Sequence, residues 1–250
     1  IPARPCLTVN LLDQPIQQVM NEARQARLTI DIGPKSGRAN TATASYIKSL
    51  MRDIQADSGA LSVRLWALER TIKAGRGAYR IRTDYANDND FDLDIIIERI
   101  LDQATVYWDA YAQYPDNRDA EWAFVTDVMS ENERLRRWPE KPLLVSESGW
   151  LEEDSWFSVD ENGKRSVRIG EYFKVIHTRR TLAHHPTVGV RFLDQMPPEV
   201  QEAAKRLGGQ VRTREVDQRS IQYVIVDGSQ VLETPRWMGR YITIVPVLGK

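Results

Sequence analysis

The chain has 250 residues, 42% of them hydrophobic, so it is long enough to bury a sizeable core in one large domain or two small ones. Its 34 basic and 35 acidic residues give a formal net charge of -1, which argues against a protein that grips nucleic acid over its whole surface, because such affinity comes from neutralising phosphates. The single cysteine excludes an internal disulfide, and no run approaches the roughly 20 apolar residues of a membrane span.

The first third of the chain is predicted to be mainly helical, because apolar residues recur at three- and four-residue steps over 10–27, 41–57 and 61–74. Asp13 is expected to cap the first of these helices, and Gly75 to stop the third. Inward-facing side chains are predicted at Leu12, Ile16, Val19, Met20 and Ala23, at Ala44, Ile47, Leu50, Met51 and Ile54, and at Leu61, Leu65, Leu68 and Ile72.

Strands are predicted to dominate from residue 78 onward. Alternating apolar and polar residues predict partner strands over 78–83 and 93–100, joined by the polar connection 84–92. Asn162-Gly163 is a strong hairpin signal between strands expected at 155–159 and 166–176. The remaining expected elements are strands over 28–32, 188–193, 211–226 and 241–247, helices over 130–137 and 197–207, and a turn at 33–37.

This order of elements favours an α+β fold, with N-terminal helices packed on a mainly antiparallel sheet, over a doubly wound parallel sheet. We find no repeat and no clear linker, so residues 1–250 are treated as a single domain with a mainly helical part at 1–77 and a mainly strand part at 78–250. The chain begins with Ile rather than Met and shows no signal segment, and we therefore expect a piece of a longer protein.

Five aspartates in the first connection between strands are the best candidates for metal binding. They are Asp84, Asp88, Asp90, Asp92 and Asp94, whose carboxylates could converge on Ca²⁺ or Mg²⁺. Leu93 stands where a calcium loop needs glycine, and Arg99 where it needs a bidentate glutamate. A solvated hairpin connection explains the same residues, and we favour that interpretation because blocks of like charge are usually solvated.

Other residue types that carry chemistry lack partners at a useful spacing. The residues weighed are Cys6, His177, His184, His185, the segment Ser146–Gly149 and the segment Gly33–Gly37. Cys6 has no histidine near it in the sequence and is interpreted as a core residue, while the histidines lack the spacing of a zinc site. The two segments lack the glycine pattern of a nucleophile elbow and of a phosphate loop. We predict no catalytic, cofactor-binding or metal-binding residues.

Arginines and tryptophans are the remaining candidates for binding. Arg76–Arg82 and Arg212–Arg214 could touch DNA, and Arg80 and Arg82 fall on one face of a predicted strand. We favour a solvated sheet face on which these arginines pair with Asp or Glu of a neighbouring strand, because the net charge gives no support to a binding surface. The chain has seven tryptophans, most of them expected in the core and some in subunit interfaces.

Several short motifs occur in an order that resembles the portal proteins of short-tailed phages. The motifs are Arg4–Asn10, the helix end Asn21–Arg27, Arg76–Ile81, the segment Asp84–Val125, Arg168–Phe173, and Pro235–Gly249 with Gly239–Ile242 and Val245–Val247. Each motif is weak alone, and the ordered set runs along nearly the whole chain.

The resemblance implies a structural, non-enzymatic protein without cofactors, covering the α+β wing region of a portal subunit. Such subunits form a twelve-fold ring at one capsid vertex of the virion, after synthesis in the cytoplasm of the bacterial host. The implied partners are other portal subunits, the terminase large subunit, scaffolding and coat proteins, a tail adaptor protein, and double-stranded DNA that passes without specific contacts; no membrane is implied. The stem and crown regions of the family are not expected in this chain.

Two alternatives stay open beside the portal interpretation. One is a divalent-metal-dependent phage nuclease that uses the acidic run Asp84–Asp94. The other is a plain adaptor or scaffold-binding lobe, which would bind a specific partner without forming rings.

Overall fold

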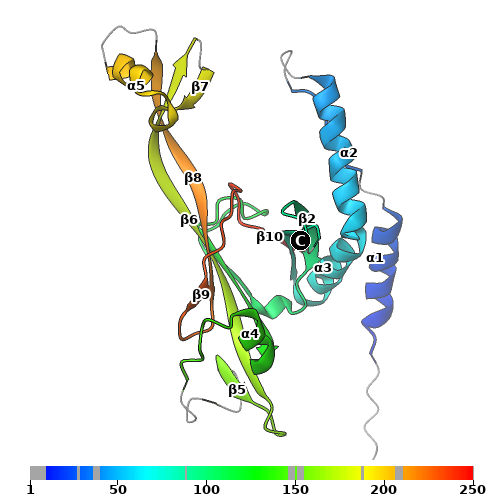
Figure 1. Ribbon diagram of the computed structural model, residues 1–250. Helices are drawn as coiled ribbons and strands as arrows, with labels where there is room; N and C mark the ends of the chain where they lie inside the picture. Colours follow the sequence, from blue (N-terminus) through cyan, green and yellow to red (C-terminus); the bar gives the residue numbers. More distant parts are fainter. Residues whose placement is uncertain are drawn as a thin grey trace, which may run out of the picture. The chain divides into compact units, whose positions relative to one another are not determined.

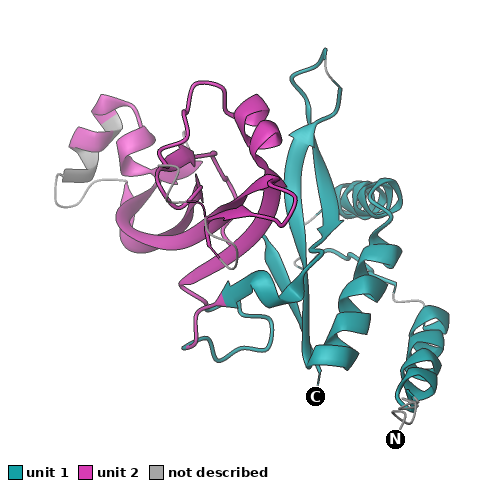
Figure 2. Ribbon diagram, turned by 90° about the horizontal axis from the view of Figure 1, so that it is seen from below, with its two compact units in different colours: residues 1–107, 111–119, 243–250 teal, residues 108–110, 120–242 magenta. Residues whose placement is uncertain are grey.

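The structure is a computed structural model that describes residues 10–26, 29–35, 40–87, 89–145, 150, 155–186, 189–205 and 211–249. The chain forms two compact units, drawn in different colours in Figure 2. Unit 1 comprises residues 1–107, 111–119 and 243–250, and unit 2 comprises residues 108–110 and 120–242. Unit 1 holds both helices and strands, so the units do not divide at the expected change near residue 77, and the single-domain assignment stays a prediction.

Unit 1 begins with three helices close to the predicted ranges: α1 (Asp13–Gln25), α2 (Thr41–Asp57) and α3 (Ala60–Ala74). Asn40 starts α2, because its side chain accepts a hydrogen bond from the backbone N–H of Ala42 at 2.9 Å. Gly75 ends α3 with a φ of 80°, a left-handed conformation that glycine adopts without strain, as predicted.

Two local predictions in the N-terminal part are wrong. Asp13 does not cap α1, because Leu12 occupies the cap position; Asp13 lies in the first turn, where its charge complements the helix dipole. The segment 29–34 forms no strand, and residue 28 lies outside the described ranges. Asp31 in this segment instead forms an ion pair with Lys48 of α2, so the segment is tied to a helix rather than to a sheet.

Unit 1 is completed by a three-stranded antiparallel sheet in the order β10-β1-β2, made of β1 (Arg76–Tyr85), β2 (Leu93–Arg99) and β10 (Ile244–Leu248). Helix α3 packs on this sheet at very short range. A Cβ atom on Gly77 would lie 2.1 Å from the carbonyl oxygen of Ala67, so only glycine allows this approach. The hydroxyl oxygen of Thr71 lies 2.9 Å from the carbonyl oxygens of both Ala67 and Val247, which joins α3 to β10.

The buried face of α3 is shifted from the predicted one by one or two positions along the helix. Its buried side chains are Ala60, Val63, Ala67 and Thr71, whereas the prediction was Leu61, Leu65, Leu68 and Ile72. Leu61 is 61% exposed. Small residues are needed on the sheet-facing side because β1 comes so close, and the larger apolar residues are left half-buried. In the other two helices the prediction is confirmed in part: Met20 and Ala44 are buried as predicted. Leu12, Val19, Ile47 and Leu50 are exposed, against the prediction.

Unit 2 is built on a long two-stranded ribbon, seen in Figure 1 as the twisted pair β6 and β8. Its strands are β4 (Trp122–Ser130), β5 (Phe157–Val159), β6 (Arg165–His185), β7 (Gly189–Phe192), β8 (Arg212–Val226) and β9 (Val231–Glu233). Strands β4, β6, β8 and β9 are hydrogen-bonded in that order, and β5 and β7 also pair with β6. All of these pairs are antiparallel.

The two ends of the ribbon carry different elements (Figure 1). One end holds α4 (Glu131–Arg137), β5 and the main core, whose buried side chains are Trp138, Phe157, Val167, Ile169, Ile225 and Leu232. The other end holds β7, the 3-10 turn η3 (Leu193–Gln195) and α5 (Pro198–Lys205), over a small core of Ala183 and Met196. Elsewhere the 3-10 turn η1 (Gln103–Thr105) precedes β3 (Val106–Trp108), and the chain passes from unit 1 into unit 2 through β3.

The fold is α+β with mainly antiparallel sheets, as predicted. The Asn162-Gly163 hairpin is confirmed, because Phe157 pairs with Val167 and Gly163 has a φ of 76°. Within the described ranges, the helices are too short or too polar to span a membrane.

Candidate functional site

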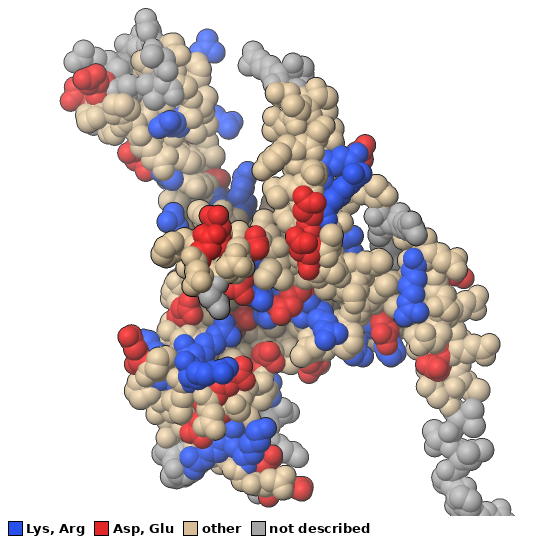
Figure 3. Space-filling model, turned by 45° about the vertical axis from the view of Figure 1, so that its right-hand side comes forward, with Lys and Arg blue, Asp and Glu red and all other residues tan. Residues whose placement is uncertain are grey.

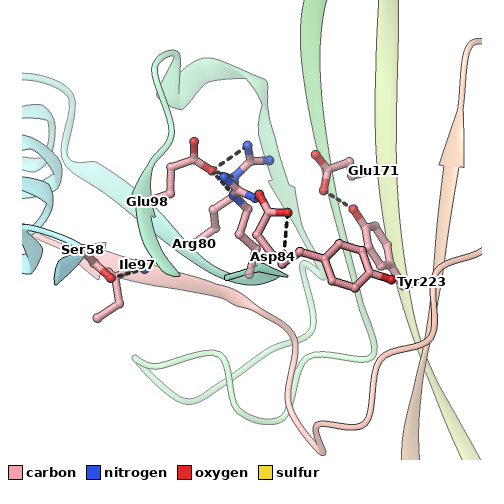
Figure 4. A network of polar contacts seen from close by, with 9 residues as sticks. Ser58, Arg80, Asp84, Ile97, Glu98, Glu171 and Tyr223 are labelled. Carbon is pink, nitrogen blue, oxygen red and sulfur yellow. Dashed lines mark hydrogen bonds and ion pairs between the residues drawn. The ribbon is translucent and has the colours of Figure 1, made fainter. Parts of the chain in front are cut away.

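Arg80 and Arg82 of β1 form a charge network on one face of the unit 1 sheet, while Arg76 at the start of the strand is exposed. Arg80 and Arg82 both reach Glu98 of the neighbouring strand β2, each with Nε 3.0 Å from the same carboxylate oxygen. Arg82 also pairs with Asp84 at 2.5 Å. Figure 4 shows Arg80, Asp84 and Glu98 turned toward one another. The prediction that these arginines pair with acidic residues of a neighbouring strand is confirmed, so this face offers little free positive charge to a phosphate.

Electrostatics within this network keep Arg82 charged. Partial burial alone would lower the pKa of the Arg82 guanidinium, but Asp84 and Glu98 outweigh that effect and raise the pKa. The opposite, apolar face of the sheet is where the helices pack, and Ser58 accepts a hydrogen bond from the backbone N–H of Ile97 at 3.1 Å there (Figure 4). The sheet of unit 1 is therefore amphipathic, with ion pairs on one side and core on the other.

The acidic run builds a turn rather than a cluster. Asp90 accepts hydrogen bonds from the backbone N–H groups of Phe91 at 2.7 Å and Asp92 at 3.2 Å, which is how an Asx turn closes. Asp84 and Asp94 are opposite each other in the β1–β2 register. Asp88 lies outside the described ranges. Over the described part of the chain, histidines, cysteines and acidic residues do not gather in threes around a common point where a metal could bind.

The three histidines lie along β6 and do not converge. His177 stands between two carboxylates, with Nδ1 3.1 Å from Asp217 and Nε2 3.3 Å from Glu121. His184 and His185 are neighbours on one strand, so their side chains point to opposite faces of the sheet. His177 therefore takes part in a surface ion pair when it is protonated.

Charged side chains of both signs are interspersed on the face drawn in Figure 3. Arg212 and Arg214 are exposed near the end of the β6–β8 ribbon, opposite His184 and Leu182. Among the tryptophans only Trp138 is buried; the partly buried ones are Trp66, Trp108, Trp122, Trp150, Trp156 and Trp237. We expected most tryptophans in the core. Trp138 is a buried core residue, and the other six are only partly buried.

A buried ion pair in unit 2 was missed by the sequence reasoning. Arg134 of α4 and Asp227 in the β8–β9 turn are both 0% exposed, and Nη2 of Arg134 lies 2.5 Å from Oδ2 of Asp227. Arg134 also donates to the carbonyl of Lys141. The other carboxylate oxygen of Asp227 accepts from the Ser229 hydroxyl at 2.8 Å and from the backbone N–H groups of Ser229 at 3.2 Å and Gln230 at 3.1 Å.

Burial alone would raise the pKa of Asp227, but the hydrogen bonds from Arg134, Ser229 and Gln230 outweigh it and hold the pKa below its ordinary value. The carboxyl is therefore ionised near neutral pH, and the pair fastens α4 to the end of β8. The sequence predicts a turn at Asp227-Gly228, but it does not indicate that Asp227 pairs with Arg134, which lies 93 residues away. This arrangement is structural, since both side chains are sealed from solvent.

The remaining candidates lie wholly or partly outside the described ranges. Cys6 and the segment 146–149 are not described, and of the segment 33–37 only residues 33–35 are, with no regular structure.

The comparisons with known proteins point to one family. The model of the family described as phage P22-like portal protein matches residues 2–250. The portal protein of Acyrthosiphon pisum secondary endosymbiont phage 1 is 25% identical over 263 residues, which cover 98% of this chain and 35% of that relative. The chain thus spans about a third of the length of that relative.

Proposed function

The chain belongs to the family of phage P22-like portal proteins, and from this premise we propose that it forms a structural part of the ring through which phage DNA is packaged and ejected. The observation that carries the proposal is the family match over residues 2–250, together with the relative named as a portal protein. The ring, its location at a capsid vertex of the virion and its passive, non-enzymatic role all belong to this proposal.

The charges of the described residues are compatible with a subunit of a DNA channel that lets DNA pass without binding it tightly. Tight binding to DNA requires cations that are free to neutralise phosphates. Arg80 and Arg82 of β1 instead share Glu98, Arg82 also pairs with Asp84, and the chain as a whole carries a net charge of -1. A surface of this kind supports passage of DNA better than retention.

The partners follow from the same premise and are proposed with it. They are further portal subunits, the terminase large subunit, scaffolding and coat proteins, and a tail adaptor protein. A ring arises when one surface of each subunit binds a different surface of the next and the rotation closes. Terminase would supply the energy for packaging, so this chain needs to provide only shape and contacts.

The test uses the full-length protein and the phage that encodes it. Negative-stain electron microscopy of the purified protein is expected to show annular particles. Phage whose gene for this protein is inactivated should assemble heads that contain no genome, and a supplied wild-type copy should restore packaging. Normal genome packaging without the protein would refute the proposal.

No observation in the described ranges favours the nuclease alternative, and a single variant separates it from the portal proposal. Replacing Asp88, Asp90 and Asp92 together by Asn removes the carboxylates that a metal would need. A nuclease would show Mg²⁺-dependent DNA cleavage that this variant loses. We expect no cleavage by the wild type or by this variant. The exposed Asp127→Asn serves as a control for loss of a carboxylate outside the acidic run.

A further inference from the structure

A short loop of unit 2, residues 236–241, has no regular secondary structure but is closed by contacts among its own residues. The indole N–H of Trp237 donates a hydrogen bond to the carbonyl oxygen of Tyr241 at 3.2 Å and closes the loop. Gly239 lies under the indole, because a Cβ atom there would be 2.3 Å from Nε1 of Trp237. A side chain at position 239 would have to displace the indole of Trp237, so glycine suits this arrangement of the loop. We call it the basic loop.

The basic loop exposes large apolar groups beside positive charge. Met238 is 81% exposed and Tyr241 is 61% exposed. Arg236 and Arg240 flank them and are also exposed. The segment from residue 234 to residue 250 contains no acidic residue, so these arginines have no acidic neighbour close to them in the sequence. Met, Tyr and Arg are enriched at protein interfaces, and Tyr and Arg are also enriched among the residues that contribute most of the binding energy there.

Unit 1 offers a surface with the complementary chemistry, at the turn between β1 and β2. Phe91 is 93% exposed and Leu93 is 54% exposed. Asp90 and Asp92 lie beside them and are exposed, and no lysine or arginine occurs between Thr83 and Glu98. The hydrogen bonds that Asp90 accepts from the backbone hold this acidic turn in place. One chain thus carries two exposed apolar surfaces of opposite charge, the basic loop in unit 2 and the acidic turn in unit 1.

We propose that the basic loop of one copy binds the acidic turn of a second copy. Phe91 would pack against Met238 and Tyr241, and the carboxylates of the turn would face Arg236 and Arg240. Because the two surfaces are different, the contact is head-to-tail and leaves one free surface of each kind on every pair. This inference rests on the proposed function, since it names surfaces by which copies of the chain would associate.

Disulfide trapping tests the contact directly. Phe91→Cys and Met238→Cys are made in separate chains, each also carrying Cys6→Ser so that residues 1–250 hold no other thiol. Mixing the two under mild oxidation is expected to give a covalent dimer. Leu144→Cys, at a comparably exposed apolar position in unit 2, replaces Met238→Cys in the control mixture and should give none. Equal dimer yields in both mixtures would overturn the proposal.

A chain that carries both cysteines distinguishes contact between copies from contact within one copy. If the contact lies between copies, dilution should abolish the cross-link and leave free thiols. A disulfide that forms within single chains at every dilution would overturn the proposal, because the turn would then occupy the loop of its own chain.

Charge exchange provides an independent measurement. Asp90→Lys with Asp92→Lys, or Arg236→Glu with Arg240→Glu, places like charges in contact and should weaken self-association about tenfold or more in sedimentation experiments. An equimolar mixture of the two variants should regain association through its opposite charges. Unchanged association in either variant would contradict the contact.

The two proposals fail in distinguishable ways. Annular particles that form equally well with either charge variant would refute this contact and leave the portal function standing. Association that follows the charges without annular particles would support the contact and count against the portal ring.

Discussion

Replacing Asp227 by Asn tests the buried ion pair that fastens α4 to the end of β8. Asn keeps the shape of the side chain and an acceptor for Ser229, but it places amide N–H groups against the guanidinium of Arg134. Arg134 is 0% exposed, and its Nε already has no hydrogen-bond partner among the described residues. Its charge would then be offset only by the carbonyl of Lys141. Leaving a buried charge in this way costs about 3–5 kcal/mol.

The reverse change should cost less, which gives the prediction a direction as well as a size. In Arg134→Met, Asp227 keeps three donors, the hydroxyl and N–H of Ser229 and the N–H of Gln230. The loss is then closer to that of one hydrogen bond to a charged group, about 1.5–3 kcal/mol. The double variant should lose less than the sum of the two single losses, because neither charge is left alone.

Hydrogen exchange is the appropriate assay, because a chain with two compact units need not unfold in one step. The amides of α4 and β8 should exchange faster in Asp227→Asn, while those of α3 and β1 in unit 1 serve as the internal control. A loss below about 1 kcal/mol, or a larger loss in Arg134→Met than in Asp227→Asn, would refute the reasoning.

The pH dependence follows from the lowered pKa of Asp227. The folded-state pKa lies below the unfolded value of about 3.9, so the stabilisation is present above about pH 4 and is lost as the pH falls through the folded value. The difference in stability between the wild type and Asp227→Asn should therefore be constant near neutral pH and shrink in acid. A difference that grows below pH 4 would contradict this assignment.

Three further changes test the packing of unit 1 and the start of α4. Gly77→Ala forces a Cβ atom to within 2.1 Å of a backbone oxygen and should cost about 3 kcal/mol or more, measured by hydrogen exchange of the α3 and β1 amides, whereas Gly33→Ala, with no atom within 4 Å, should be neutral. Thr71→Val leaves the carbonyl of Val247 without its hydroxyl donor and should cost about 1–2 kcal/mol by the same measurement. Ser130→Ala removes the side chain that accepts from the first turn of α4 and should cost about 1 kcal/mol, seen as faster amide exchange confined to that helix.

Local signals predicted the elements that depend on neighbours in sequence. The bounds of α2 matched the prediction because its helical period begins at a capping Asn40 and ends before Ser58-Gly59. The hairpin at Asn162-Gly163 was also found, because a positive φ at the glycine is needed there and the sequence supplies it.

Elements that depend on distant partners could not be found in this way. β6 was expected to end at residue 176 but continues to His185, because the polar residues beyond 176 are held by pairing with β7 and β8 rather than by an apolar pattern. The face of α3 that is buried depends on the close approach of Gly77, which helical periodicity alone does not contain. The return of β10 to pair with β1 likewise has no local signal.

The same limit applies to the candidate sites. Pairing of Arg80 with an acidic residue of the next strand was predictable, because both belong to one hairpin. The partnership of Arg134 and Asp227 was not, because 93 residues separate them. Part of the basic loop, Gly239–Tyr241, belongs to a motif noted in the sequence. The packing of Trp237 against Gly239 and its hydrogen bond to Tyr241 are not indicated by the sequence.

The long pairing of β6 with β8 has a mechanical consequence. The two strands stay in register from Gly170 opposite Val226 to His184 opposite Arg212. The hydrogen bonds between antiparallel strands run perpendicular to the strands, so a force along the strands loads all of them at once and they must break together. A force that separates the strands at one end breaks these hydrogen bonds one after another. The pairing of β6 with β8 should therefore resist a force applied along the strands better than a force that pulls the strands apart from one end. Its mechanical strength depends on the direction in which a partner pulls.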